Sequence, residues 1–225
     1  MGITRNTTQQ PSVILDKNLA RIVAHELLSI SAIQLNVEKP FTWVSGIKSP
    51  VYCDNRKVNS HVTTRNIIAD SFVKLITNNF RDIEVIAGVA TGGIPMGILI
   101  ADRLKLPFVY VRQEPKEHGL MKQVEGDYSV GQNVILIEDH VSTGGSSLKA
   151  VNGLLHEGLN VLALVSIMTY NFNTAIDLFM DHSIKHVSLS DLDTVLDQAL
   201  LEKRLTEEQV ESVLIFRSEP KSWKV

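Results

Sequence analysis

The chain has 225 residues, of which 44% are hydrophobic and 21% charged, which excludes disorder as its dominant state and indicates one large α/β domain with an elaboration. Its single cysteine, Cys53, excludes an intrachain disulfide and a cysteine zinc cluster. The 22 basic and 25 acidic residues give a net charge of −3, so there is no global positive field for duplex nucleic acid and an anionic ligand must be bound locally.

The N-terminal stretch 1–10 is polar, and no apolar core of a signal peptide follows it. The longest apolar runs, such as 161–165, are far shorter than the ~18 residues of a membrane helix. We therefore expect a cytoplasmic protein whose partners include neither a membrane nor a nucleic acid.

Helical spacing of apolar residues predicts a first helix over 16–31 and a second over 63–80. The stretch between them, 41–56, has no helical period and places aromatic residues beside lysine and serine. This composition is too rich in functional side chains for a plain linker.

Short apolar runs rich in β-branched residues then alternate with helical stretches. The predicted strands are 85–90, 108–111, 134–137 and 161–168, and the intervening helices are 94–104 and 147–157. Continuous apolar strands are buried on both faces, which is typical of a parallel sheet with crossover helices. We predict an α/β fold with a doubly wound, mainly parallel sheet flanked by helices.

The C-terminal part reads as helical. Thr206 with Gln209 predicts a capping box, and Ser190 with Asp193 fits a second one. We expect a single domain over 1–225, with an N-terminal helix and small hood over about 16–60, an α/β core over about 61–190 and C-terminal helices over about 190–225.

The segment 134–147, VILIEDHVSTGGSS, carries the strongest chemical signal. Its hydroxyl and glycine residues suit a phosphate at a helix N-terminus, at the strand edge where α/β proteins bind ligands. The adjacent carboxylates of Glu138 and Asp139 suit ribose hydroxyls or a water-bearing Mg²⁺. Phosphate and ribose together indicate a phosphoribosyl group, although the string alone also fits a plain helix cap.

Basic residues gather in a second segment, 112–127, which is made flexible by glycines and lies just before this motif. Such a segment suits a lid that closes over a polyanion and excludes water. The alternative is a solvated surface loop.

Three strings resemble known signatures. IEDHVSTGGSS resembles the phosphoribosyl pyrophosphate (PRPP) binding motif of the type I phosphoribosyltransferases. FTWVSGIKSPVYCDNR, at 41–56, resembles the N-terminal signature of the orotate phosphoribosyltransferase family, and VRQEPKEHG, at 111–119, resembles its mobile catalytic loop. The resemblance covers nearly the whole chain after the polar tail.

The resemblance implies transfer of a phosphoribosyl group from PRPP to orotate, giving orotidine 5′-monophosphate and pyrophosphate. The implied catalytic residues are Lys116, His118 and Arg112. These three are also implied to bind PRPP, together with Thr91, Gly92, Glu138, Asp139, His140, Val141, Ser142, Thr143, Gly144, Gly145 and Ser146. The implied orotate-binding residues are Lys48, Tyr52, Cys53 and Ser142.

The resemblance also implies Mg²⁺ carried by PRPP without a direct protein ligand, and a homodimer whose lid loop is shared across subunits. For Tyr52 the alternative is a core aromatic, and for 90–97 it is a structural tight turn. Val44, Gln113, Thr91-Gly92 and Tyr170 depart from positions where some family members carry cationic or other contacts. The residue that binds the orotate carboxylate therefore stays open.

Three other functions remain at this point. A phosphoribosyltransferase for another base shares the PRPP motif, and a PRPP-binding regulator keeps the loop without catalysis. A regulator is expected to carry a nucleic-acid-binding element, which the sequence lacks. An unrelated nucleotide-binding α/β protein leaves the basic segment unexplained.

Overall fold

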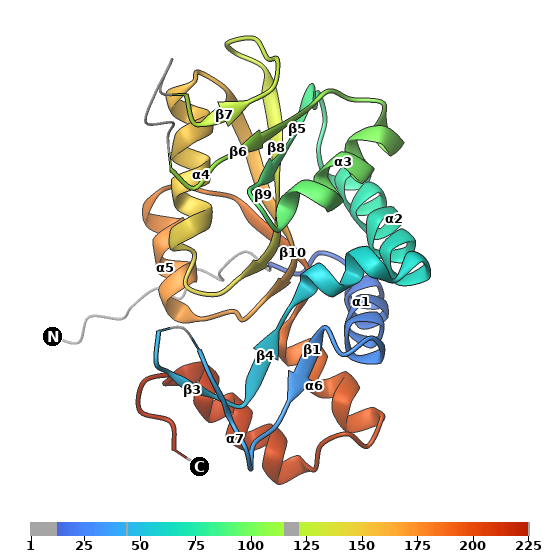
Figure 1. Ribbon diagram of the computed structural model, residues 1–225, viewed down its shortest axis with the longest axis vertical. Coiled ribbons are helices and arrows are strands. Elements are labelled where there is room, and N and C mark those ends of the chain that lie inside the picture. The colour runs from blue at the N-terminus through green and yellow to red at the C-terminus, as the bar shows by residue number, and fades with distance from the viewer. Residues whose placement is uncertain (1–12, 44, 115–121, 225) are drawn as a thin grey trace, which may run out of the picture.

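The computed structural model describes residues 13–43, 45–114 and 122–224. Its centre is a six-stranded sheet of order β10-β9-β8-β5-β6-β7 (Figure 1). The strands are β5 (Val85–Val89), β6 (Phe108–Val111), β7 (Val124–Glu125), β8 (Asn133–Val141), β9 (Asn160–Thr169) and β10 (His186–Asp191). All neighbours are parallel except β7, which pairs antiparallel with β6. The predicted mainly parallel α/β sheet is confirmed.

The four predicted strands are all present, and two further strands of this sheet escaped the sequence patterns. In β10, serines replace the continuous apolar run that marked its neighbours, and β7 is only two residues long. Strand β8 also runs further than predicted, because its pairing with β9 continues through Val141 and Thr169. Glu138 and Asp139 thus lie within the paired part of β8, near its C-terminal end, and the pairing with β9 fixes their backbone.

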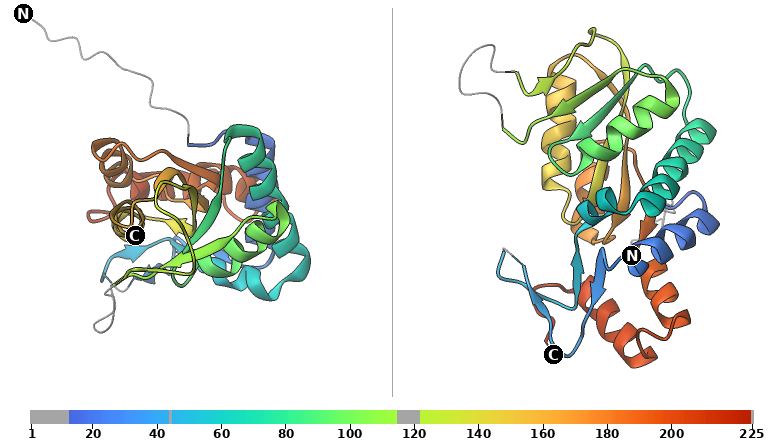
Figure 2. Two further views of the ribbon diagram at one scale, coloured as in Figure 1. Left: turned by 90° about the horizontal axis from the view of Figure 1, so that it is seen from above. Right: turned by 45° about the vertical axis from the view of Figure 1, so that its right-hand side comes forward.

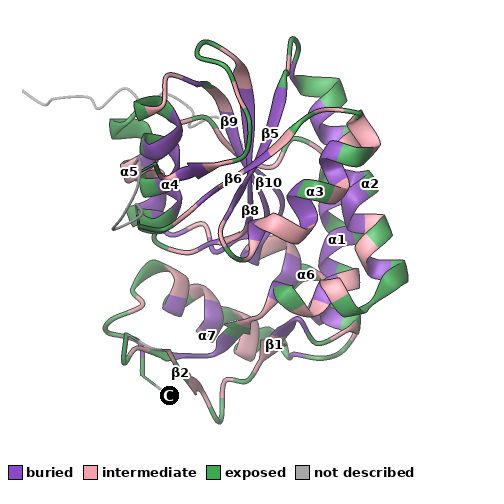
Figure 3. Ribbon diagram, turned by 45° about the horizontal axis from the view of Figure 1, so that its top comes forward, coloured by how far each residue is buried: buried purple, intermediate pink, exposed green. Residues whose placement is uncertain are grey.

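Helices cover both faces of the sheet (Figure 1). One face packs against α1 (Lys17–Ser29), α2 (Val62–Asn79) and α3 (Gly93–Leu104), and the other against α4 (Gly145–His156) and α5 (Asn173–Asp181). Alternate residues of β8 point to opposite faces of the sheet. Ile135 and Ile137 pack in the core with α1, α2 and α3, whereas Val134 and Leu136 pack in the core with α4 and α5. Figure 3 shows these strands and the inner faces of the helices as buried. The double winding explains why the strands read as continuous apolar runs.

Capping residues begin the C-terminal helices α6 (Leu192–Leu201) and α7 (Glu207–Ser218). The capping box of Thr206 and Gln209 at α7 is confirmed. The predicted box at Ser190 is wrong, because Ser190 belongs to β10 and its hydroxyl donates to the carbonyl of Ala20 at 3.0 Å. Asp191 caps α6 instead, accepting from the backbone N–H of Thr194 at 2.9 Å.

The segment 33–53, here called the hood, forms two small antiparallel pairs beside α6 and α7 (Figure 2, right). Its strands are β1 (Ile33–Leu35), β2 (Phe41–Thr42), β3 (Lys48–Ser49) and β4 (Val51–Cys53), followed by the 3₁₀ helix η1 (Asn55–Ser60). The Asn55 side-chain amide donates to the Asp139 carbonyl at 2.7 Å, which ties the hood to the end of β8.

No helix in 13–43, 45–114 or 122–224 combines the length and the hydropathy that crossing a membrane requires.

Candidate active site

Two adjoining cavities open where β8 and β9 end beneath the hood. The first, called the acidic cavity, has a volume of about 440 Å³ and brings together predicted residues from three segments. These are Cys53, Thr91, Gly92, Glu138, Asp139, His140, Ser142 and Ser146. The second, called the aromatic cavity, has a volume of about 400 Å³ and is lined by Thr42, Trp43, Tyr52, Cys53, His140, Ser142 and Tyr170.

The turn before α3 lies directly against the carboxylate of Asp139. A methyl group added at Gly92 would come within 2.5 Å of Asp139 Cγ, so only glycine allows this approach. The Ala90–Thr91 peptide bond is cis, and the Gln113 side-chain amide donates to the Ala90 carbonyl at 3.2 Å. The turn at 90–92 therefore contacts both the carboxylate of Asp139 and Gln113, which lies at the start of the predicted lid.

The two adjacent carboxylates have different electrostatic states. Burial, then repulsion from Asp139, raises the pKa of Glu138 well above its usual value, and its oxygens accept from Asp139 N–H and the Ser147 hydroxyl. Burial also acts to raise the pKa of Asp139, but His140 outweighs it and the net shift is downward. Asp139 therefore carries the negative charge that faces the cavity.

The loop 142–146 leads into the N-terminus of α4, as the phosphate prediction requires. Gly144 has a φ of +81°, a left-handed conformation that favours glycine and lets the chain turn into the helix. The first N–H groups of α4 and the hydroxyls of Ser142 and Ser146 can together donate hydrogen bonds to an anion. Val141 is 1% exposed, so it can reach a ligand only through its backbone, and Thr143 faces a neighbouring cavity beside Trp43.

The aromatic cavity is assembled from segments far apart in sequence. Trp43 packs edge-on against Tyr170 with ring centroids 5.3 Å apart, and its indole N–H donates to the Val51 carbonyl at 3.1 Å. Tyr52 packs against Phe41 at 5.5 Å. Burial raises the pKa of the Cys53 thiol, which therefore stays neutral. The result is a flat-walled, mostly apolar slot suited to an aromatic ring.

Some predicted residues lie elsewhere. Arg112 directs its guanidinium to Glu125, 3.5 Å away on β7, and Lys48 is exposed, with Nζ donating to the Thr42 hydroxyl at 2.8 Å. Gly145 does belong to the site, because it begins α4 and contributes one of the first N–H groups of that helix. The predictions for Lys116 and His118, and the departure at Val44, fall outside the described residues.

Sequence reasoning missed Arg56 and Asp54, which line the acidic cavity and pair with each other at 2.6 Å. Their position next to Cys53 in the string YCDNR was the available signal. Their place in the cavity follows from the turn of η1 toward β8, which local patterns do not encode.

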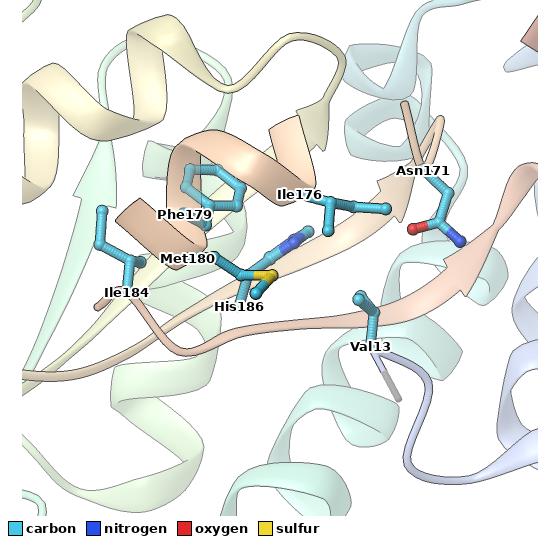
Figure 4. A pocket seen from close by; sticks show the side chains of 7 residues that line it. All are labelled: Val13, Asn171, Ile176, Phe179, Met180, Ile184 and His186. Carbon is cyan, nitrogen blue, oxygen red and sulfur yellow. The ribbon is translucent and has the colours of Figure 1, made fainter. Parts of the chain in front are cut away.

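A third, smaller cavity of about 190 Å³ lies between α5 and β10, apart from these residues (Figure 4). Its lining is mostly apolar, with His186 Nε2 lying 3.0 Å from the Ser166 hydroxyl. It holds none of the predicted site residues.

The acidic cavity fits the Mg²⁺ complex of a phosphorylated ligand. Its carboxylate and hydroxyl oxygens can accept hydrogen bonds from the waters that Mg²⁺ keeps when it arrives on such a ligand. Within 13–43, 45–114 and 122–224, no cluster of three His, Cys, Asp or Glu side chains has the arrangement of a metal site.

Comparison with known proteins identifies the class first. The family described as "Phosphoribosyl transferase domain" matches residues 59–186, which include the Gly92 turn and the loop after β8. An orotate phosphoribosyltransferase from Bacteroides thetaiotaomicron is 45% identical over 207 residues, which is 92% of this chain and 98% of the relative.

Solved structures agree. Orotate phosphoribosyltransferase from Aeropyrum pernix matches with a TM-score of 0.68 at 30% identity, covering 78% of this chain and 97% of that one. Leishmania donovani UMP synthase shares the fold with a TM-score of 0.74 at 23% identity, covering 89% of this chain and 42% of that longer protein. This chain belongs to the orotate phosphoribosyltransferase family.

Proposed function

We propose that this protein is an orotate phosphoribosyltransferase, an enzyme that transfers the phosphoribosyl group of PRPP to orotate in pyrimidine nucleotide synthesis. The observation that carries the proposal is the pair of adjoining cavities. One suits a ribose phosphate and the other a planar ring, and they share Cys53, His140 and Ser142. Two substrates bound in them would meet at this shared boundary.

The acidic cavity accounts for the phosphoribosyl half of the reaction. The N-terminus of α4 and the hydroxyls of Ser142 and Ser146 would bind the 5′-phosphate. The ionised Asp139, held in place by the turn at Gly92, would accept hydrogen bonds from the ribose hydroxyls. Its negative charge also favours the oxocarbenium character that develops on the ribose.

The bond change is a direct exchange at the anomeric carbon. The bond from this carbon to the pyrophosphate oxygen breaks, the bond to the orotate ring nitrogen forms, and the nitrogen's proton passes to water. The leaving pyrophosphate gains negative charge, which Lys116 and His118 would neutralise, together with Arg112 once its guanidinium turns from Glu125. Mg²⁺ arriving on PRPP would supply further neutralisation.

We also propose a homodimer in which the lid loop of one subunit closes over the site of the other, as the family resemblance implies. A cytoplasmic location belongs to the same proposal, because PRPP and orotate are anions that do not cross membranes unaided.

The test is the ultraviolet absorbance of orotate mixed with purified protein, PRPP and Mg²⁺. PRPP-dependent loss of orotate absorbance is the expected result, with uracil, adenine, hypoxanthine and guanine as competing acceptors. Turnover of another base but not orotate would overturn the substrate assignment. Calorimetric binding of PRPP without any turnover would favour the regulator.

A further inference from the structure

The boundary between the two cavities determines where the orotate carboxylate lies. Orotate attacks the anomeric carbon through ring nitrogen N1, and its carboxylate is attached to the neighbouring ring carbon, C6. If the ring occupies the aromatic cavity and N1 faces the ribose, the carboxylate lies within two bonds of the reacting atom. It must therefore sit beside the residues common to both cavities, which are Cys53, His140 and Ser142.

Negative charge already surrounds this boundary. Asp54 and the ionised Asp139 line the adjoining acidic cavity, and Asp139 Oδ1 lies 3.2 Å from His140 Nδ1. A carboxylate entering here without a cation would be repelled and would lose its hydration. The boundary therefore needs a positively charged donor.

Of the three shared residues, only His140 can carry a positive charge. Ser142 is neutral, and Cys53 stays a neutral thiol because burial raises its pKa. The His140 ring packs near Tyr170 with centroids 6.3 Å apart, and its Nδ1 is shielded from solvent, 3.2 Å from Asp139 Oδ1. With Nδ1 facing Asp139, the opposite nitrogen, Nε2, is the one left for a ligand.

The charges around His140 favour its protonated form. Burial lowers the pKa of His140 and Arg56 adds to that effect, but Asp139 and, more weakly, Asp54 outweigh them, so the net shift is upward. Among the described residues that line the acidic cavity, Arg56 is the other cation, and it is a weaker candidate. Its Nε is bound to Asp54 at 2.6 Å, its side chain is 67% exposed, and it does not line the aromatic cavity.

We propose that His140, whose Nδ1 lies 3.2 Å from Asp139, is the specificity residue that binds the carboxylate of orotate. This inference rests on the proposed function. It gives the chain a cation for the carboxylate despite Tyr170 and Gln113, where some relatives have cationic contacts.

The test compares orotate with orotamide, its neutral amide of nearly the same shape, on the wild-type enzyme and three variants. The wild type is expected to prefer orotate by about 10- to 100-fold in kcat/KM, the range for one charge-assisted hydrogen bond. In His140→Leu and His140→Gln this preference should fall to within about 3-fold of unity, since the carboxylate loses its charged partner. Arg56→Gln is the matched control and should keep the wild-type preference.

Both substrates are measured on the same preparation, so partial unfolding or weaker PRPP binding cancels from the ratio. An unchanged ratio in both His140 variants would overturn the assignment, as would its loss in Arg56→Gln alone. Failure of the proposed function is distinct, because the wild type would then consume no orotate.

Discussion

The acidic and aromatic cavities are built in different ways. The acidic cavity comes mainly from consecutive residues at the end of β8 and from the turn before α3, both fixed by the sheet. The aromatic cavity joins Trp43 and Tyr52 of the hood to Tyr170 after β9. A rigid sheet edge thus suits the ribose phosphate, which a whole class of enzymes shares, whereas the added hood suits the base that distinguishes its members.

Replacing Lys116 by alanine should give the largest effect, because the proposed mechanism assigns this side chain to the charge of the leaving group. We expect kcat to fall by about 10³-fold with the fold retained in circular dichroism. Lys122→Ala is the matched control, since Lys122 lies in the same basic segment with Nζ 5.4 Å from the Tyr128 ring centre, and it should stay within about 3-fold of wild type. Unchanged turnover in folded Lys116→Ala would remove the lid from the mechanism.

Mixed subunits extend this prediction to the dimer. If the lid crosses between subunits, Lys116→Ala combined with Asp139→Ala restores one complete site per mixed dimer. Random exchange should then recover about a quarter of wild-type activity. Failure to recover activity, with mixed dimers shown by mass spectrometry, would indicate self-contained sites.

Gly92→Ala tests how rigid the acidic half is. The new methyl group would lie 2.5 Å from Asp139 Cγ and displace this carboxylate. We expect kcat/KM for PRPP to fall by about 10²-fold, while KM for orotate changes little because the aromatic half is untouched. If Gly92→Ala kept the wild-type kcat/KM for PRPP, the exact position of the Asp139 carboxylate would not matter for catalysis.

His186 shows what a histidine on the same sheet does without the carboxylate that His140 has. Burial lowers its folded pKa to about 3, below the unfolded value of about 6.5, so the unfolded state takes up the proton first as the pH falls. Stability is therefore full above about pH 6.5 and declines toward pH 3. Between pH 7.5 and 5, His186 should cost the wild type about 2 kcal/mol of unfolding free energy.

Urea unfolding at both pH values measures this loss. His186→Gln should lack it, and His182→Gln, a change at an exposed histidine that ends α5, should retain it. Equal pH dependence in wild type and His186→Gln would contradict the assignment.

Tyr52 gives the smallest expected effect and tests the aromatic half. Tyr52→Ala should raise KM for orotate by about 10-fold through lost ring contact, with KM for PRPP nearly unchanged. Tyr52→Phe keeps the ring and should stay within about 2-fold of wild type. Equal rises in both KM values would mean that the two halves are not separable.

Local sequence determined the four central strands of the sheet and most of the acidic cavity. These strands are buried on both faces and read as continuous apolar runs, and a loop that binds phosphate at a helix N-terminus needs contiguous glycine and hydroxyl residues. Both constraints act within short segments such as 134–147, so both are visible in the chain itself.

Tertiary structure alone decided the rest. The polar strand β10 forms because β9 offers it an edge, and its serines bond across the sheet at Ser166 and Ser188, 2.9 Å apart. Arg56 reaches the cavity only because Asn55 anchors η1 to β8. His140 looked like one more residue of a loop motif, and its position between two cavities depends on walls supplied by segments about ninety residues before it and thirty after it. Such long-range packing leaves no local pattern, because the contacts join residues that are distant in the chain.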